Sequence, residues 1–398
     1  MRILFLTFYF QPDLCAGSFR ATALVKALRF INPTVDVDVV TTLPNRYSTF
    51  SRDALEAEEL DGVKIFRIEL PPHKSGMVDQ CLAFWAFSRQ VQNIVRDKHY
   101  DLVIATSSRL MTAVLGAWIA SRKGVHLYLD IRDIFVDTIN DILPRYLATL
   151  AKPIFSVLEW WAVKRAGKVN LVSQGFSGYF ESRYPQQSFS YFTNGVDDDF
   201  LISQPETLLL PKCLHPLRIV YAGNIGEGQG LHAILPELSQ RMKDRVNFRI
   251  IGDGGRKELL QKSLSSAGVT NVTLFPPMSR DQLIEEYKQA DVLFLHLNNY
   301  EAFKKVLPSK LFEYAAMGKP IWAGIPGFSA DFIRSEITNA VVFSPCDAAE
   351  AEQVLDGLVI KDAPRSEFIE KFSRVNICRD MAKDIFNFAK INYKLKGK

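Results

Sequence analysis

Residues 303–320 read FKKVLPSKLFEYAAMGKP, and this stretch predicts a short helix with one buried side. Pro308 suits the first helical position, where its missing N–H costs nothing. Gly318 fits the helix end, and Pro320 prevents any continuation. Apolar residues recur between them at helical spacing, namely Leu311, Phe312, Ala315 and Ala316.

Charged side chains at the start of this helix predict a nucleotide site. Lys305 and Lys310 lie on either side of the helix N-terminus, which attracts anions through its free N–H groups and its dipole. Glu313, one turn further on, can accept hydrogen bonds from two adjacent hydroxyls, such as those of a ribose. A diphosphate and a ribose together describe a nucleotide. An ordinary amphipathic helix with solvated lysines explains the same pattern equally well.

The length and composition predict a folded chain of at least two domains. A chain of 398 residues is too long for one ordinary core, and 47% hydrophobic with 23% charged residues is typical of globular proteins. No uncharged apolar run reaches the about 18 residues of a membrane-spanning helix, and the first residues are typical of a strand, not of a signal peptide. The cysteines lack metal-ligand spacing and predict reduced thiols in a cytoplasmic protein: Cys15, Cys81, Cys213, Cys346 and Cys378.

Short apolar runs alternate with helical patterns in both halves of the chain. In the first half we expect strands at 2–8, 35–41, 63–70, 102–106, 126–131 and 168–172, and helices at 18–30, 78–96, 110–121 and 153–164. Turn residues and prolines at 196–216 predict a linker, after which the alternation restarts. The pattern predicts two parallel-sheet α/β domains, 1–195 and 217–375, and a last helix at 376–398. Ligands of such sheets bind at the carboxyl ends of the strands, so the cleft between two sheets is the expected site.

Two glycine-rich turns follow strands of the second half. YAGNIGEGQGL contains Gly223, Gly226 and Gly228, and RIIGDGGRKEL contains Gly252, Gly254 and Gly255 with Arg256 beside them. Glycine lets the backbone approach a phosphate closely, so two such turns before the lysine-flanked helix favour a diphosphate site. For either turn alone, a tight turn that needs a positive φ is the better explanation.

The first half carries three candidate residues at the ends of strands. Gly17 lies between the first strand and its helix, and Arg132 and Asp133 follow the strand that ends near Asp130. Arg132 could clamp a phosphate in bidentate fashion, and Asp133 could orient or deprotonate an acceptor hydroxyl. A buried ion pair at a strand end explains Arg132 and Asp133 nearly as well.

The triplet Asp197–Asp199 resembles a carboxylate metal site, but it follows the turn dipeptide Asn194-Gly195 and better fits a hinge. The histidines show no ligand spacing, so we predict no metal.

Aromatic and basic residues gather at 142–168. One helical face holds Ile154, Val157, Leu158 and Trp161. The segment contains five Lys or Arg and a single acidic residue, Glu159, which gives a local charge of +4. The first 195 residues hold 22 Lys and Arg against 18 Asp and Glu, which is weak support for an anionic surface nearby. Such a helix is typical of a membrane interface, and we expect contact with the cytoplasmic membrane. A core-packing helix is the alternative, and it is the better explanation for Trp161.

These motifs together resemble the retaining glycosyltransferases of family 4, above all the bacterial branch that builds O-antigen and capsule oligosaccharides. The resemblance covers nearly the whole chain and is specific for fold and superfamily, but not for one sugar. It rests on the loop at Gly17 and on the segments IRDIF at 131–135, NGVD at 194–197, YAGNIG at 221–226, GDGG at 252–255 and PSKLFEYAAMGKP at 308–320.

The resemblance implies the GT-B fold, in which two Rossmann-like domains face each other across a cleft and the C-terminal helix packs back across it onto the first domain. The second domain would hold a nucleotide-sugar and the first an acceptor. The implied nucleotide-sugar-binding residues are Gly17, Gly223, Asn224, Gly226, Gly254, Arg256, Lys305, Ser309, Lys310, Leu311 and Glu313, and the implied catalytic residues are Asp133, Arg132, Lys310 and Glu313. Such enzymes need no metal or other cofactor, so cationic side chains and the helix N-terminus would stabilise the leaving diphosphate.

The chain departs from the family pattern at two places. Lys305 stands where many members carry a glutamate that holds the donor sugar. Asn224 and Gln229 stand where many carry an arginine and a lysine. These changes leave the donor sugar open and shift the charge on the diphosphate to Arg256, Lys305 and Lys310.

We therefore predict a hexosyltransferase-type enzyme that moves a sugar from a UDP-linked, rather than GDP-linked, donor to a lipid-linked saccharide at the inner face of the cytoplasmic membrane, with no nucleic-acid partner. A deoxy or N-acetylated hexose fits the donor. Three alternatives stay open: a nicotinamide-dependent reductase, a catalytically silent scaffold of a polysaccharide assembly complex, and a nucleotide-sugar epimerase. The reductase would need a three-glycine dinucleotide turn followed by an acid, which neither glycine turn provides.

Overall fold

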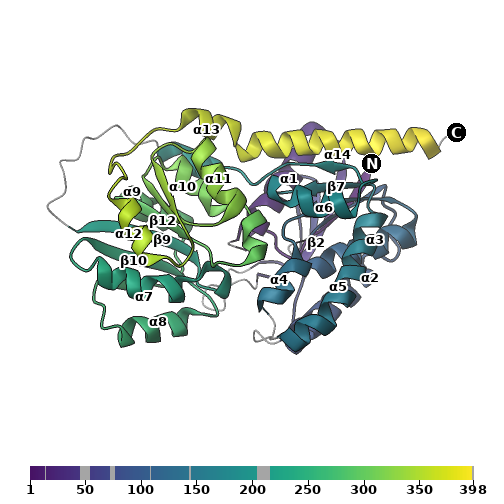
Figure 1. The fold of residues 1–398 in the computed structure, drawn as a ribbon. Helices are drawn as coiled ribbons and strands as arrows, with labels where there is room; N and C mark the ends of the chain where they lie inside the picture. Colours follow the sequence, from purple (N-terminus) through teal and green to yellow (C-terminus); the bar gives the residue numbers. More distant parts are fainter. Residues whose placement is uncertain are drawn as a thin grey trace. The chain divides into compact units, whose positions relative to one another are not determined.

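The computed structural model describes residues 1–13, 15–44, 54–71, 77–107, 109–142, 145–203 and 216–396. The chain divides into two compact units. The first consists of Met1–Asn194 together with Arg374–Lys398, and the second of Gly195–Ser373. Each contains a parallel sheet covered by helices, so the prediction of a two-domain α/β fold is confirmed (Figure 1).

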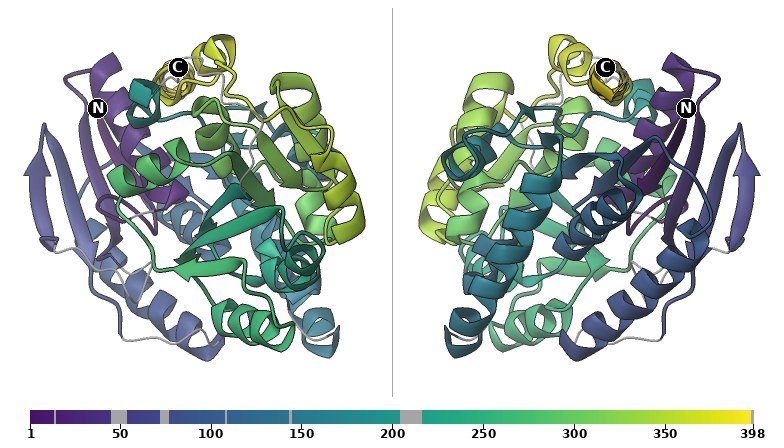
Figure 2. Two further views of the ribbon diagram at one scale, coloured as in Figure 1. Left: turned by 90° about the vertical axis from the view of Figure 1, so that its left-hand side faces the viewer. Right: turned by 90° about the vertical axis from the view of Figure 1, so that its right-hand side faces the viewer.

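The described part of the first unit forms an eight-stranded sheet with the order β3-β4-β2-β1-β5-β6-β7-β8. Its strands are β1 (Arg2–Leu6), β2 (Asp36–Thr42), β3 (Ala57–Leu60), β4 (Val63–Ile68), β5 (Leu102–Thr106), β6 (His126–Ile131), β7 (Lys168–Leu171) and β8 (Phe189–Ser190). Only the β3–β4 pair is antiparallel within this sheet, and it lies at the outer edge (Figure 2). No sequence pattern indicates β3, because its residues AEEL face solvent without apolar alternation.

The helices of the first unit are α1 (Ala16–Ile31), α2 (Met77–Val95), α3 (Leu110–Lys123), α4 (Phe135–Ile142), α5 (Arg145–Arg165), α6 (Ser177–Arg183) and α14 (Arg374–Lys396), with a short 3₁₀ turn, η1 (Gln174–Phe176). The expected start of α5 at Pro153 was wrong, since Pro153 lies inside the helix. Packing of α5 against α3 and α4 supports the turns that precede it, which local proline preference cannot indicate.

The second unit has a six-stranded parallel sheet with the order β11-β10-β9-β12-β13-β14. The strands are β9 (Leu217–Asn224), β10 (Val246–Asp253), β11 (Val272–Phe275), β12 (Val292–His296), β13 (Ile321–Gly324) and β14 (Ala340–Phe343). The helices are α7 (Leu231–Arg241), α8 (Lys257–Ser266), α9 (Arg280–Lys288), α10 (Lys310–Ala316), α11 (Gly327–Glu336), α12 (Ala348–Leu355) and α13 (Ser366–Lys371), and the 3₁₀ turns are η2 (Asp198–Ser203), η3 (Glu227–Gln229) and η4 (Glu301–Lys305). Of the predicted linker 196–216, residues 204–215 lie outside the described residues.

The C-terminal helix returns to the first unit, as the sequence predicted. Helix α14 packs along α1, and its buried residues Cys378, Met381 and Ile385 belong to the same core as Ile3 and Phe5 of β1 (Figure 1). The two points where the chain passes between units lie next to each other. There the backbone N–H of Val196 donates to the Phe372 carbonyl at 2.8 Å, and Val196 forms a parallel bridge with Ser373.

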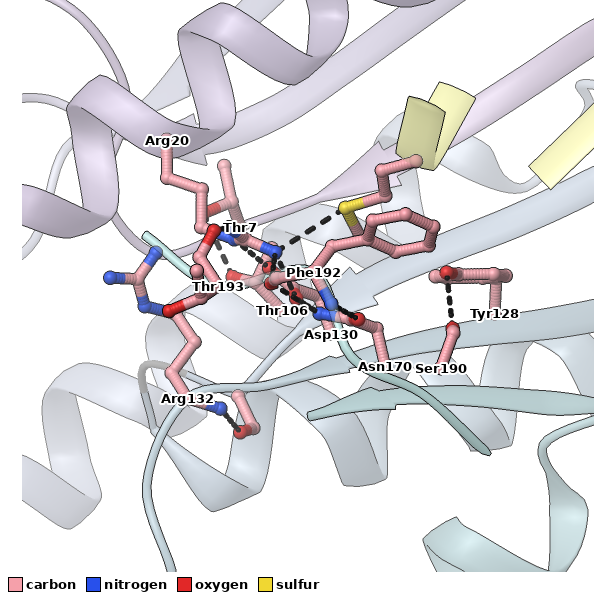
Figure 3. A network of polar contacts seen from close by, with 12 residues as sticks. Thr7, Arg20, Thr106, Tyr128, Asp130, Arg132, Asn170, Ser190, Phe192 and Thr193 are labelled. Carbon is pink, nitrogen blue, oxygen red and sulfur yellow. Dashed lines mark hydrogen bonds and ion pairs between the residues drawn. The ribbon is translucent and has the colours of Figure 1, made fainter. Parts of the chain in front are cut away.

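A buried ion pair between Arg20 and Asp130 ties α14 and the end of the first unit's main segment to its sheet (Figure 3). The Arg20 guanidinium, on α1, donates to both Asp130 carboxylate oxygens at 2.8 and 3.0 Å and to the carbonyls of Phe192 and Thr193. It also lies 3.3 Å from the Met381 Sδ on α14. Burial alone raises the pKa of Asp130, but the charge of Arg20 outweighs this effect and keeps that pKa below its usual value.

We expect Arg20→Met to lower the free energy of unfolding of the first unit by about 3–5 kcal/mol, because Asp130 would stay buried without its counter-ion. Urea denaturation in a Trp322→Phe background would measure this, since the remaining tryptophans all lie in the first unit. The exposed Arg96, whose guanidinium bonds only Asn93 among the described side-chain hydrogen bonds, provides the control Arg96→Met, with an expected change within about 0.5 kcal/mol. Equal effects of the two substitutions would contradict the prediction.

Candidate functional site

Helix α10 is the centre of the candidate site in the second unit. The predicted apolar side is confirmed, because Leu311, Phe312, Ala315 and Ala316 are all buried. The predicted start at Pro308 was wrong by two residues: the N–H of Leu311 donates to the Pro308 carbonyl in a tighter turn, and regular helix begins at Lys310. With seven residues, α10 offers a weaker helix dipole than the sequence analysis assumed.

Lys310 and Glu313 lie together on the first turn of α10. The Lys310 Nζ donates to the Glu313 Oε2 at 2.8 Å and lies 3.4 Å from the Tyr287 hydroxyl. Glu313 is buried, whereas Lys310 is partly exposed. A carboxylate and an ammonium group are thus held side by side, which suits adjacent hydroxyl donors and an anion.

The remaining predicted residues around α10 differ in how accessible they are. Lys305 ends η4, five residues before Lys310, and Ser309 directly precedes the helix without a side-chain capping bond. Leu311 is fully buried and its N–H already bonds Pro308, so its side chain serves the core.

The two glycine turns pack against each other, backbone to backbone. They follow the neighbouring strands β9 and β10, in which Gly223 pairs with Gly252. A Cβ on Gly252 would lie 1.9 Å from the Gly223 carbonyl oxygen, and a Cβ on Gly254 2.6 Å from the Ile225 oxygen. Both residues also have positive φ, +150° and +154°, so the contact between the turns requires glycine at each.

Hydrogen bonds within the first turn occupy groups that the sequence suggested for a phosphate. The Gln229 Oε1 accepts from the Gly226 N–H at 3.2 Å and from the Asn224 Nδ2 at 2.8 Å. The Gln229 carbonyl lies 2.7 Å from the His296 Nδ1, and the His296 Nε2 accepts from the Cys346 N–H. His296 is therefore neutral with its proton on Nδ1, and burial lowers its pKa to about 4. This histidine, which the sequence did not single out, fixes the first turn.

Arg256 follows the second glycine turn and forms an ion pair with Glu227 of the first turn. The backbone of Arg256 also contributes, since its N–H donates to the Ile225 carbonyl at 2.9 Å. Glu227 therefore lies at the candidate site as well, although the sequence analysis assigned it no function.

In the first unit, Arg132 and Asp133 follow β6. The Arg132 N–H donates to the Ser107 Oγ at 3.0 Å, burial lowers the pKa of the half-buried guanidinium, and Asp133 is exposed. A buried ion pair does lie at this strand end, but it joins Asp130 to Arg20. Arg132 and Asp133 thus lie beside this ion pair, just beyond the carboxyl end of β6.

Gly17 and Arg109 lie near the same end of the sheet. A Cβ on Gly17 would contact Cys15 and Tyr9 at an ordinary 3.7 Å, so packing does not require glycine there. Arg109 was not among the residues predicted from the sequence, and its guanidinium lies 4.0 Å above the Phe8 ring and 3.4 Å from the Tyr9 hydroxyl. Its position three residues after β5 is the signal that could have found it.

A small pocket beside Asp133 contains a buried acid. Ser107, Ile131, Phe135 and Phe180 line it, together with Glu159 of α5. Tyr179 and Tyr184 donate to the Glu159 Oε1 at 2.9 and 3.1 Å, and burial raises the pKa of Glu159 to about 6.

The outer face of α5 is apolar. Its large exposed apolar residues, between 47% and 71% accessible, are Leu150, Ile154, Val157 and Trp160. The Lys164 Nζ lies 4.6 Å above the Trp160 ring. Leu158 and Trp161 of the predicted face are instead half-buried, because the helix is turned by about one residue. Among the described residues, no helix combines the length and the apolarity needed to cross a membrane.

The carboxylates of the Asp197–Asp199 triplet have a structural partner. Arg280 of α9 forms ion pairs with Asp197 and Asp199 and stacks 4.8 Å above Phe200. Within the part of the chain that the structure describes, no group of three or more His, Cys, Asp or Glu is arranged to hold a metal ion.

Two family models match the chain, one in each half. Residues 214–374 match the family "Glycosyl transferases group 1", and residues 18–188 match the "Glycosyl transferase 4-like domain". The chain therefore has the two domains and the fold of a glycosyltransferase of the GT-B type.

Among its relatives is the putative colanic acid biosynthesis glycosyl transferase WcaI of Escherichia coli K12, 40% identical over 101 residues. This match spans 25% of the chain and only 24% of that relative. Similar solved structures include sucrose-phosphate synthase from Thermosynechococcus elongatus (TM-score 0.67, 13% identity, 100% and 98% of the two chains) and WaaG, a glycosyltransferase involved in lipopolysaccharide biosynthesis (TM-score 0.63, 14%, 99% of each). Anabaena HepE, solved in complex with UDP, has a TM-score of 0.58 at 16% identity over 100% and 99%. At identities of 13–16%, these structures show that the chain shares their fold, and no more.

We expect Glu159→Gln to stabilise the protein at pH 8 by about 2 kcal/mol, and much less at pH 5. The native pKa of Glu159, about 6, lies above its ordinary value of 4.5. The neutral acid therefore favours folding at low pH, and this contribution is lost as the pH rises through 6. Glutamine keeps an oxygen for Tyr179 and Tyr184 without the buried charge. Melting temperatures of both proteins between pH 5 and 8 would check this, and a difference independent of pH would refute it.

Proposed function

We propose that the protein is a retaining glycosyltransferase that moves a sugar from a UDP-linked donor to a lipid-linked saccharide acceptor in the synthesis of cell-surface polysaccharide. The observation that carries the proposal is the Lys310–Glu313 pair, in the same unit as two packed glycine turns at the carboxyl ends of β9 and β10. Its relatives support the pathway, since WcaI is named for colanic acid and WaaG for lipopolysaccharide. The UDP complex of HepE supports the choice of nucleotide.

In this proposal the second unit binds the donor. Glu313 accepts hydrogen bonds from the ribose hydroxyls, and Lys310 and Arg256 balance the charge of the diphosphate. Ser309 and Lys305 lie in the segment leading into α10 and also contact the diphosphate in this proposal. The glycine turns present a surface without side chains at Gly223, Gly226 and Gly254, with Asn224 between them, where a Cβ on any of the three glycines would meet protein atoms; the donor would therefore contact the backbone of the turns.

The first unit would bind the acceptor. Gly17 can admit a ligand close to the backbone, because packing does not require a glycine there. Arg132 would bind a phosphate, and Asp133 would orient the attacking hydroxyl. The bond from the sugar C1 to the diphosphate oxygen breaks and a bond from C1 to the acceptor oxygen forms on the same face. The acceptor proton passes to the departing phosphate, and a nucleoside diphosphate leaves. Cationic side chains stabilise it in place of a metal ion.

A thermal-shift screen against UDP, GDP, CMP, NADH and a panel of UDP- and GDP-sugars tests the donor. A ligand that binds only the folded protein raises its melting temperature by mass action. We expect a shift with UDP that grows with one attached sugar, followed by transfer with retained anomeric configuration in NMR analysis of the product. A shift with NADH alone would favour a reductase. Donor binding without turnover across many acceptors would favour a scaffold, an alternative that Lys305 supports by standing where many relatives carry a sugar-binding glutamate.

We expect Glu313→Ala to weaken UDP binding by about tenfold to a hundredfold, because hydrogen bonds to a charged group contribute about 1.5–3 kcal/mol. Isothermal titration calorimetry would measure the affinity, and the melting temperature would show that the variant is folded. The control is Glu285→Ala, which removes an exposed carboxylate paired with Lys288 on α9. Wild-type affinity and turnover in Glu313→Ala would remove Glu313 from the site.

The outer face of α5 would hold the enzyme at the cytoplasmic surface of the membrane. Exposed Ile154, Val157 and Trp160 provide apolar area, and Lys164 provides positive charge beside the Trp160 ring. We expect the double variant Ile154→Ser/Trp160→Ser to lose binding to vesicles of phosphatidylglycerol and phosphatidylcholine in sedimentation assays. Leu259→Ser, at a partly exposed position of α8 in the other unit, is the control. Equal sedimentation of wild type and the α5 variant would contradict membrane contact through this helix.

A further inference from the structure

The carboxylate of Glu227 lies between the two glycine turns and is held from two sides. Its Oε2 pairs with the Arg256 Nε, and its Oε1 accepts from the Tyr300 hydroxyl at 2.5 Å. The Asn298 Nδ2 donates to the Glu227 carbonyl at 3.1 Å, and the Asn298 N–H donates to the Gly228 carbonyl at 2.8 Å. The segment that follows β12 therefore fixes both the backbone and the side chain of this glutamate.

Arg256 is important for the charge at these turns. The first turn carries the neutral side chains of Asn224 and Gln229, which bond to each other. In the second turn, Lys257 lies 3.9 Å from Asp253 and donates to the Gly252 carbonyl at 3.3 Å. His232 lies 3.9 Å from Glu227 on the other side. Arg256 is thus the strong cation that borders both turns, and Glu227 neutralises it.

The Arg256–Glu227 pair is open to solvent. The side chain of Arg256 is 45% exposed and that of Glu227 is 31% exposed. An ion pair with this exposure is screened by water and contributes little to stability. The Arg256 backbone stays fixed by its hydrogen bond to the Ile225 carbonyl, so the guanidinium can change partner without movement of the turn.

We propose that Glu227 is a resident counter-ion of Arg256 and that the diphosphate of the donor replaces it when a nucleoside diphosphate sugar binds. The inference rests on the proposed function and adds to it a residue that sets the affinity of the site for phosphate groups. In the free protein the carboxylate pairs with the Arg256 Nε, and a phosphate in its place could form a bidentate contact with the guanidinium. Tyr300 holds Glu227 after the exchange.

The exchange has a consequence for ligand selection. Any anion that approaches the turns must compete with a tethered carboxylate, so a simple phosphate gains little by binding there. A nucleotide has further contacts, through its ribose at Glu313 and its charge at Lys310, and these offset the competition. Glu227 therefore lowers the affinity for the donor and for free phosphate alike, so only a ligand with the further contacts of a nucleotide still binds well.

A double-mutant cycle tests this exchange. We expect Glu227→Gln to bind UDP about threefold to tenfold more tightly than wild type in calorimetry at pH 7.5, since the amide oxygen keeps the Tyr300 bond but frees Arg256. Arg256→Gln should bind UDP more weakly. In the Arg256→Gln background, the added Glu227→Gln substitution should give a distinctly smaller gain, because there is no guanidinium left to release.

The matched control is Glu237→Gln, which breaks an exposed Glu–Arg pair with Arg241 on α7 and should leave UDP affinity unchanged. An equal gain from Glu227→Gln with and without Arg256 would overturn the exchange, because simple charge repulsion would then explain it. Unchanged or weaker binding by Glu227→Gln, while wild type binds UDP, would also overturn the exchange and leave the proposed function standing. Failure of wild type to bind any nucleotide would overturn both.

Discussion

The ion pair between Arg20 and Asp130 determines how the first unit holds together. A buried carboxylate at a strand end needs a counter-ion, and the guanidinium that supplies it also satisfies the carbonyls of Phe192 and Thr193. One side chain thereby joins α1, β6 and the last residues before the chain leaves this unit. The Asn170 Nδ2, 2.7 Å from Asp130, completes the group. Because Arg20 is the ion-pair partner of Asp130, Arg132 does not take that place and lies just beyond the carboxyl end of β6.

In the second unit, the main constraint is the close contact between the two glycine turns. The carboxyl ends of β9 and β10 lie side by side, and only glycine at 252 and 254 allows the backbones to meet. The first turn is then fixed by side chains that donate to its carbonyls, His296 to that of Gln229 and Asn298 to that of Glu227. A rigid backbone surface results, on which the side chains of Arg256 and Glu227 are the adaptable parts.

Local signals in the sequence predicted much of this structure. Alternating apolar runs indicated both sheets, and the pattern at 308–320 indicated α10 with its buried side. Contacts between distant positions gave no such signal: Arg20 and Asp130 are 110 residues apart, and Glu227 and Arg256 are 29 apart. The burial of Glu159 was equally hidden, since a glutamate among exposed lysines in a helix is normally solvated. For the candidate site, the sequence identified residues and could not say which of their groups already have partners.

The second unit is an insertion in the first, and the bridge between Val196 and Ser373 joins the two ends of the inserted segment. Residues Met381, Ile385 and Ala389 pack with Ile3 and Phe5, so the first core stays incomplete until the chain has been synthesised almost to its last helix. The second unit, a single continuous segment, can complete its own core earlier. We therefore expect the second unit to fold before the first during synthesis on the ribosome, because part of the apolar surface of the first sheet stays uncovered until α14 is made.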